Sequence, residues 1–303
     1  MGTVTRHEVR RVGAPYDPDA TAAYAAWRDA KLAAYPAGLA GLLVEVRDPR
    51  ALTRGEREAL LDRCRRANMA VYASGAADAD KSIPRRLGEQ LGLTRLDRNW
   101  LADDDGISPI RVAAERTAER GDYVPYTDRP IRWHTDGYYN DASRRIRGMI
   151  LHCVANAAEG GASAFLDHEI AYLRLRDADP RHVRALMRED AMTIPERADG
   201  EGVARAAVSG PVFDVDPAGG WLGMRYTART RSIAWQRSPD VLAAVAALEA
   251  LLDAPSPFRH DVTLQPGMGI VCNNVLHRRD GFVDEASRPR LLYRARYYDR
   301  VGG

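Results

Sequence analysis

Long apolar runs are absent from this 303-residue chain, in which no eighteen uncharged apolar residues follow one another. A helix needs about 20 such residues to cross a bilayer, so the sequence predicts no membrane span and no membrane partner. Residues 1–19 alternate polar and charged side chains and lack the apolar core of a secretory signal. These absences predict a cytoplasmic protein.

Cysteine and net charge are also scarce. The three cysteines, Cys64, Cys153 and Cys272, are far apart and stand in apolar or helical surroundings, which argues against a disulfide framework and predicts reduced thiols. The formal net charge is +2, from 44 Lys and Arg against 42 Asp and Glu, so bulk charge gives no reason to expect a nucleic-acid partner. The hydrophobic content of 45% is that of an ordinary globular protein with a large core.

The chain shows no internal repeat, low-complexity tract or obvious linker, which predicts one domain over residues 1–303. Apolar residues at helical spacing predict helices over residues 20–35, 53–67, 84–93, 168–176, 181–189 and 239–253. Short apolar and β-branched segments predict strands over residues 39–46, 69–74, 146–154, 164–167, 191–195, 211–216, 221–226, 258–264, 269–273 and 290–298. Residues 1–120 are the helix-rich part of this domain. The many short strands after them predict an α+β, mainly β fold, a sandwich or open barrel flanked by helices.

Two helix starts carry specific capping signals. Thr53, followed three residues later by Glu56, matches a capping box. Ser238 precedes Pro239 and a long apolar stripe, so it is the expected N-cap of the last helix.

A candidate metal motif lies in the segment Arg132-Trp133-His134-Thr135-Asp136-Gly137. In an extended chain, residues two apart point to the same side, so His134 and Asp136 can chelate one ion. His277, which follows the apolar strand over residues 269–273, is the leading third ligand. Two histidines and one carboxylate leave positions on iron(II) open for a cosubstrate and O2. A His-x-Asp triplet also arises by chance, and a lone histidine is commonly a core or surface residue, so these residues alone leave both interpretations open.

Four segments, in this order and at compatible spacings, resemble motifs of the taurine dioxygenase family and its γ-butyrobetaine hydroxylase relatives. They are Trp133-His134-Thr135-Asp136, Gly160-Gly161-Ala162-Ser163, Asn274-Val275-Leu276-His277-Arg278 and Arg290-Leu291-Leu292-Tyr293-Arg294. The resemblance covers roughly residues 132–300 and implies a TauD/TfdA-type iron(II) and 2-oxoglutarate-dependent dioxygenase. Serine stands at 163 where the family usually has threonine, and residues 1–120 match no motif of the family.

The resemblance implies a double-stranded β-helix, a jelly-roll and cupin-like core flanked by helices. Iron(II) would be held by His134, Asp136 and His277, with 2-oxoglutarate and O2 as cosubstrates and succinate and CO2 as products. Ser163 and Arg290 would bind the far carboxylate of 2-oxoglutarate, a task that suits the bidentate geometry of arginine. With aspartate in the metal motif, hydroxylation or desaturation is favoured over halogenation.

Four arginines near the C-terminus share one parity on the expected strand, namely Arg288, Arg290, Arg294 and Arg296. Parity therefore cannot choose which one grips 2-oxoglutarate. Pro289 places Arg288 before the regular strand, because proline is confined to strand beginnings and edges. The family pattern selects Arg290 and leaves Arg294 near the metal or an anionic substrate group.

Three further side chains are candidates for substrate contact. Tyr138 and Tyr139 follow the metal motif and could line a pocket, although core packing is equally expected of them. Arg229 lies in a basic strand end that could meet a substrate carboxylate, although a solvated face explains it as well. The substrate is expected to be a small polar organic molecule, and its identity stays open.

Two other classes compete with the dioxygenase interpretation. A catalytically silent metal-binding or 2-oxoglutarate-sensing protein on the same scaffold would have no need to keep Ser163 and Arg290. A zinc hydrolase with the same three ligands would need a general base that no motif places. The sequence leaves homo-oligomerisation open.

Overall fold

The computed structural model describes residues 15–98, 103–112, 124–199, 202–229 and 233–303. The first third of the chain contributes three helices and three strands: α1 (Thr21–Ala34), β1 (Leu43–Glu45), α2 (Arg54–Ala67), β2 (Met69–Ala73), α3 (Ser82–Gln90) and β3 (Ser108–Ile110). Helix α2 begins at the predicted capping box, in which the Glu56 carboxylate accepts the backbone N–H of Thr53 at 2.6 Å and the Glu56 N–H donates to the Thr53 hydroxyl.

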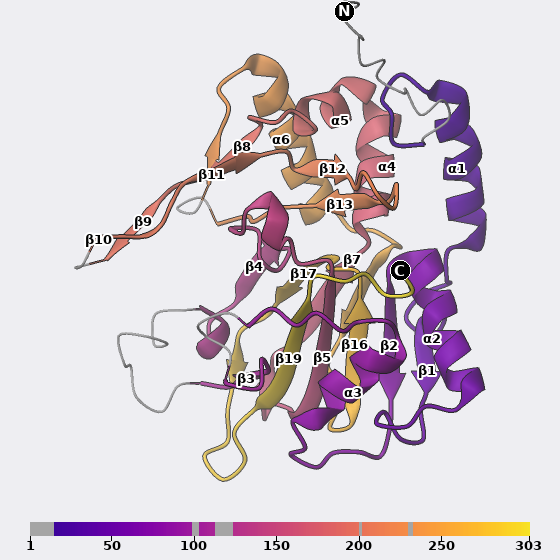
Figure 1. Ribbon diagram of the computed structural model, residues 1–303, viewed down its shortest axis with the longest axis vertical. Helices are drawn as coiled ribbons and strands as arrows, with labels where there is room; N and C mark the ends of the chain where they lie inside the picture. Colours follow the sequence, from indigo (N-terminus) through magenta and orange to yellow (C-terminus); the bar gives the residue numbers. More distant parts are fainter. Residues whose placement is uncertain (1–14, 99–102, 113–123, 200–201, 230–232) are drawn as a thin grey trace, which may run out of the picture.

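The larger sheet has six strands in the order β1-β2-β16-β5-β19-β3. Its centre is made by β16 (Met268–Cys272), β5 (Gly148–Ala155) and β19 (Leu291–Tyr297). Only β1 and β2 pair in parallel, and the other pairs are antiparallel. The N-terminal strands β1 and β2 thus extend the same sheet that the C-terminal strand completes (Figure 1).

The smaller sheet has four antiparallel strands in the order β15-β7-β17-β4. They are β15 (Arg259–Val262), β7 (Ser163–Leu166), β17 (Leu276–Arg279) and β4 (Ile131–His134). One buried cluster contains Met149, Ile270 and Leu292 of the larger sheet together with Phe165 and Val262 of the smaller one. The two sheets therefore pack face to face, and the fold is mixed α/β.

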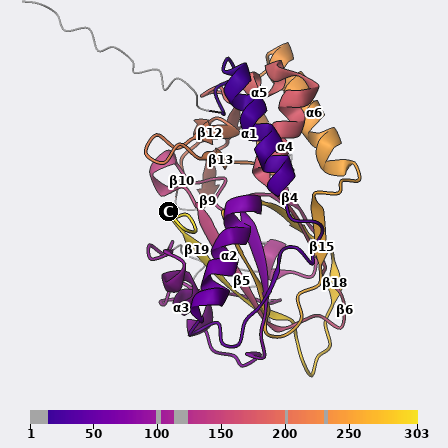
Figure 2. The same cartoon turned by 90° about the vertical axis from the view of Figure 1, so that its right-hand side faces the viewer.

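Helices cover the outer face of the larger sheet and form a layer at one end of the molecule (Figures 1 and 2). Leu60 of α2 and Leu87 of α3 pack with Ile150 and Val271 of the sheet. The end layer holds α1, α4 (His168–Ala178), α5 (Pro180–Leu186) and α6 (Pro239–Asp253), which pack with β8 (Met192–Ile194), β12 (Phe213–Val215) and β13 (Leu222–Met224). The remaining elements are β6 (Glu159–Gly160), β9 (Arg197–Asp199), β10 (Gly202–Arg205), β11 (Val208–Gly210), β14 (Ala234–Trp235), β18 (Phe282–Val283) and two 3-10 turns, η1 (Val124–Tyr126) and η2 (Ala142–Arg144).

The predicted helices are present, and Ser238 caps α6 as expected. The strand predicted over residues 39–46 is shorter in the structure. Residues 39–42 form turns, and β1 covers only Leu43–Glu45. The prediction missed several short strands without a long apolar run, among them β3, β9, β10, β11, β14 and β17. All three cysteines are buried and free. Within the described part of the chain, none of the helices combines the length and apolar character that crossing a bilayer requires.

A buried ion cluster attaches α1 to the core. The Lys31 ammonium lies 2.6 Å from both Asp167 and Glu169, and Tyr16 donates to Glu169 at 2.8 Å. The side chains of Lys31, Asp167 and Glu169 are only 5%, 0% and 8% exposed. Burial raises the pKa of Glu169, but Lys31 outweighs this effect and the pKa falls to about 2. Lys31 and Glu169 are therefore both charged at neutral pH.

Replacing Lys31 by methionine is expected to lower the free energy of unfolding by about 3–5 kcal/mol, because it leaves two buried carboxylates uncompensated. Urea denaturation at pH 7 measures the change. Since the pKa of Glu169 is lowered on folding, its contribution is present above the unfolded value near pH ~4.3 and is lost as pH falls towards 2. The difference between wild type and Lys31→Met should shrink over that window.

The chain's other lysine supplies a matched control. Lys81 also pairs with two carboxylates, those of Asp103 and Asp105 at 2.7 and 2.9 Å, but these side chains are 29–38% exposed. Surface pairs contribute about 0–1 kcal/mol, so Lys81→Met should change stability little. If both variants lost the same free energy of unfolding, the burial of the Lys31 cluster would not be the reason that it stabilises the protein.

Candidate metal centre

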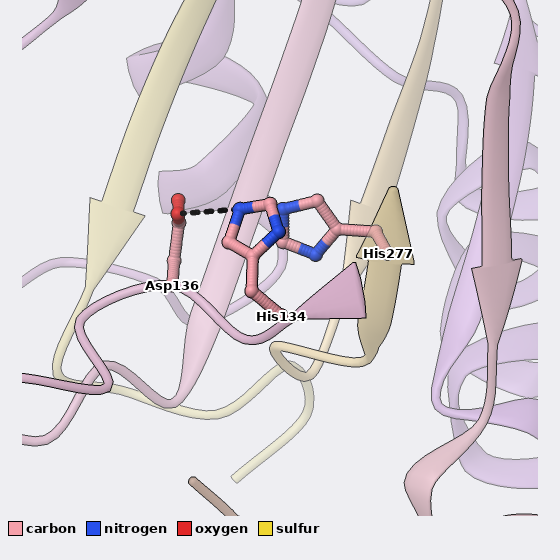
Figure 3. Close-up of side chains that lie close together, drawn as sticks. All are labelled: His134, Asp136 and His277. Carbon is pink, nitrogen blue, oxygen red and sulfur yellow. Dashed lines mark ion pairs between the residues drawn. The ribbon is translucent and has the colours of Figure 1, made fainter. Parts of the chain in front are cut away.

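Two neighbouring strands bring the predicted histidines together. His134 is the last residue of β4, and His277 lies on β17 directly opposite it in the antiparallel register. Their ring centroids are 4.1 Å apart, well inside the separation of about 8 Å beyond which one ion could not bridge them. Asp136 follows the end of β4, and one ligand atom from each of the three residues lies within 4.8 Å of the others (Figure 3).

Asn274 holds the backbone of Asp136 in place. Its amide oxygen accepts the Asp136 N–H at 2.8 Å, while its amide nitrogen donates to the Asp136 carbonyl at 2.9 Å and to the Ile146 carbonyl at 2.8 Å. Asn274 adopts φ 51°, the left-handed region that asparagine tolerates better than most residues. This turn joins β16 to β17, so one residue sets both the start of the His277 strand and the position of Asp136.

The hydrogen bonds of the two imidazoles leave their Nε2 atoms free for a metal. Nδ1 of His134 lies 2.9 Å from the Arg132 carbonyl, and Nδ1 of His277 lies 3.0 Å from the Val275 carbonyl. A carbonyl only accepts, so each Nδ1 carries the hydrogen and each Nε2 keeps a lone pair. Burial, with the neighbouring His277, lowers the pKa of His134 to about 3, and burial also lowers the pKa of His277. Both rings are therefore neutral at pH 7, as metal ligation requires.

The Asp136 carboxylate is buried and half satisfied. Arg294 donates to Oδ1 at 3.2 Å, whereas Oδ2 has no hydrogen-bond partner among the described residues. Burial raises the pKa of Asp136, but Arg294 and then Arg296 outweigh it and hold the pKa well below its usual range. An ionised carboxylate with one unpartnered oxygen, close to two neutral imidazoles, is a donor set that fits iron(II).

The residues expected to bind 2-oxoglutarate lie on the other side of β17. Arg290 is 5% exposed, its guanidinium carbon lies 5.1 Å from the Phe282 ring centroid, and no ion pair joins it to a described acidic side chain. Gly161 adopts φ +70° beside it, where an added Cβ would come within 3.5 Å of the Arg290 Nε. Ser163 is buried on β7, whereas Arg288 is exposed. Of these two arginines, Arg290 is therefore the one that is buried, and it forms no ion pair with a described acidic side chain.

The candidates for substrate contact separate into two groups. Tyr138 and Tyr139 are half-buried, and their rings meet edge to face at 5.3 Å. Arg294 reaches the metal carboxylate. Arg229 is exposed, and a substrate role for its side chain stays a prediction. Thr227, two residues earlier, forms an isolated antiparallel β-bridge with His134.

The sequence named Arg296 only as one of four arginines of the same parity, and it did not identify Asp97 or Arg205. Arg296 forms an ion pair with Asp97 at 2.5 Å and donates to the Tyr139 hydroxyl at 3.0 Å. Arg205, the last residue of β10, lies with its guanidinium carbon 5.9 Å from the centroid of the Tyr139 ring. A shared parity for Arg294 and Arg296 was the only available signal, because positions 97 and 205 belong to no motif.

The chain is similar to known proteins both in sequence and in fold. A family model described as taurine catabolism dioxygenase TauD, TfdA family, matches residues 45–296. A uridine-5'-phosphate dioxygenase from Streptomyces sp is 32% identical over 204 residues, which are 63% of this chain and 70% of that protein.

Among solved structures, a taurine dioxygenase from Burkholderia xenovorans aligns with a TM-score of 0.59 at 18% identity, covering 86% of this chain and 89% of its own. PvcB from Pseudomonas aeruginosa aligns with a TM-score of 0.56 at 17% identity, covering 85% of each chain. A second PvcB structure, described as an Fe, alpha-ketoglutarate dependent oxygenase, aligns with a TM-score of 0.55 at 16% identity over 85% of each chain. The mixed α/β fold is that of these oxygenases.

Proposed function

This chain belongs to the TauD/TfdA dioxygenase family, and we propose that it hydroxylates or desaturates a small polar organic substrate at an iron held by His134, Asp136 and His277. It is an iron(II) and 2-oxoglutarate-dependent enzyme. What we propose is which residues bind the metal and 2-oxoglutarate, and which reaction follows. The observation that carries the proposal is the convergence of three donors with free lone pairs within 4.8 Å. The buried Arg290, which forms no ion pair with a described acidic side chain, supports it.

Each residue has a distinct task in this proposal. His134, Asp136 and His277 would hold the metal and leave its other positions open, and Arg290 with Ser163 would bind the far carboxylate of 2-oxoglutarate. When bound, iron, 2-oxoglutarate and O2 supply the oxidising power, with release of succinate and CO2. Asn274 keeps Asp136 in register with His277. Arg294 stabilises the charge on Asp136 through its contact at 3.2 Å.

We extend the proposal to the architecture. The two facing sheets would form the core of a double-stranded β-helix, within one domain that spans residues 1–303. Strands β1 and β2 support the inclusion of the N-terminal 120 residues, because they hydrogen-bond into the larger sheet beside β16. The cluster of Lys31 with Asp167 and Glu169 ties α1 to α4 in the same way.

Succinate formation from 2-oxoglutarate tests the function. We expect the protein to form succinate with iron(II) and O2, and to lose this activity when zinc replaces iron. A substrate should increase the rate, and uridine-5'-phosphate is the first compound to try, because the Streptomyces relative is named for it. Equal turnover with zinc, or none with iron in the presence of any compound of a broad metabolite panel, would contradict the proposal.

A further inference from the structure

The hydroxyl group of Tyr139 accepts a hydrogen bond from Arg296, so its own hydrogen points elsewhere. Arg296 donates to the Tyr139 oxygen at 3.0 Å, and a guanidinium has only donors. The phenol oxygen therefore accepts this bond and its own hydrogen is available for another acceptor. Within the described residues no hydrogen bond uses that hydrogen. Tyr139 is half-buried, so a bound molecule can reach it.

Arg296 holds Tyr139 from a rigid position. Its side chain is 4% exposed and pairs with Asp97, whose side chain is 1% exposed, at 2.5 Å. Tyr298 also donates to Asp97, at 2.6 Å. A guanidinium that donates to a buried carboxylate and to a phenol at the same time has little freedom to turn, so the Tyr139 hydroxyl keeps a constant direction.

Arg205 approaches Tyr139 from the face of its ring. Its guanidinium carbon lies 5.9 Å from the ring centroid. Nη2 donates to the Pro195 carbonyl at 2.7 Å, whereas Nη1 is buried and has no hydrogen-bond partner. No ion pair joins Arg205 to an acidic side chain in the described part of the chain. A buried donor on a cation without a partner is costly, and an anion beside it would remove that cost.

This pair lies apart from the 2-oxoglutarate residues. Along β19, Arg294 contacts Asp136 and Arg296 contacts Tyr139, while Arg290 lies just before the strand begins. Strand rise separates Arg290 from Arg296 by roughly 20 Å, with the metal carboxylate between them. Tyr139 is three residues from Asp136 in the chain. An anion at Tyr139 and Arg205 would therefore lie nearer to Asp136 than to Arg290.

We propose that Tyr139 and Arg205 form an oxyanion subsite for the substrate, which would carry a phosphate or carboxylate group at the end away from the carbon that is oxidised. The hydroxyl of Tyr139 and the free Nη1 of Arg205 each donate to one oxygen of that group. The inference rests on the proposed function, because it assigns the substrate of the same metal centre.

Magnetic relaxation by a bound metal tests the subsite. The probes are inorganic phosphate, followed by its phosphorus signal, and acetate, followed by its carbon signal, each added to protein loaded with Mn(II) and saturated with 2-oxoglutarate. We expect saturable relaxation of at least one probe by the bound Mn(II), and the stronger binder identifies the class of anion. Tyr139→Phe and Arg205→Gln should each weaken its binding about tenfold, the effect of losing one charge-assisted hydrogen bond.

Arg197→Gln is the matched control. Arg197 lies opposite Arg205 in the hairpin register and is exposed, so its replacement should leave binding of the probe unchanged. The subsite is refuted if neither probe is relaxed in the wild type. It is also refuted if Tyr139→Phe and Arg205→Gln bind the probe normally, or if Arg197→Gln weakens binding of the probe as much as they do. Binding of 2-oxoglutarate distinguishes a failure of the subsite from a failure of the proposed function. Its absence in wild type would refute the proposed function as well, whereas its presence without oxyanion binding would refute the subsite alone.

Discussion

Replacing Asp136 by alanine is expected to abolish coupled succinate formation. The change removes the one anionic donor of the metal set and the oxygen that Arg294 contacts at 3.2 Å. The remaining two imidazoles are neutral, so iron would bind more weakly and its geometry would open. Turnover at increasing iron(II) concentration, together with the iron content of the purified protein, measures both effects.

Two further variants make this result specific. His277→Ala should be equally inactive and leaves the pair of Asp136 with Arg294 intact, which separates metal binding from a folding defect caused by an unpaired buried arginine. Asp141→Ala should keep full activity, because Asp141 is exposed and only caps the 3-10 turn η2. Full iron-dependent turnover by purified Asp136→Ala would show that the metal assignment is wrong.

Arg290→Ala is expected to raise the apparent KM for 2-oxoglutarate at least about tenfold, since a charge-assisted bidentate contact contributes about 1.5–3 kcal/mol. The burial of Arg290 without an ion-pair partner, next to Gly161, supports this choice. Burial also lowers the pKa of Arg290, which a bound carboxylate would reverse. Steady-state kinetics with varied 2-oxoglutarate and saturating iron give the value.

Arg288→Ala is the matched control for that measurement. Arg288 stands two residues earlier, is exposed, and precedes the strand, so its loss should change the KM little. If Arg288→Ala were the impaired variant and Arg290→Ala the normal one, the assignment of the cosubstrate arginine would be reversed.

Local chemistry in the sequence determined the elements with strong short-range signals. Thr53 and Glu56 are three residues apart and cap α2 through contacts that need no distant partner. Ser238 caps α6 in the same way. The three expected metal ligands could also be named, because His134 and Asp136 are neighbours in the chain and His277 lies in a segment resembling a known motif.

Only the tertiary structure decided how these residues meet and what surrounds them. His134 faces His277 because β4 pairs with β17, a strand without a long apolar run, and Asn274 sets the turn before it. A bulge between Leu291 and Leu292 interrupts the regular register of β19, so parity alone could not place Arg290 relative to Arg294.

The residues around Tyr139 show most clearly what the sequence could not predict. Asp97 and Arg205 lie 42 and 66 positions from Tyr139 in the chain, and no spacing rule connects them. Arg229 belonged to a basic segment beside the metal strand, yet its side chain is exposed. Contacts between residues so far apart depend on how sheets and hairpins pack, and that packing minimises the free energy of the whole chain rather than of any local segment.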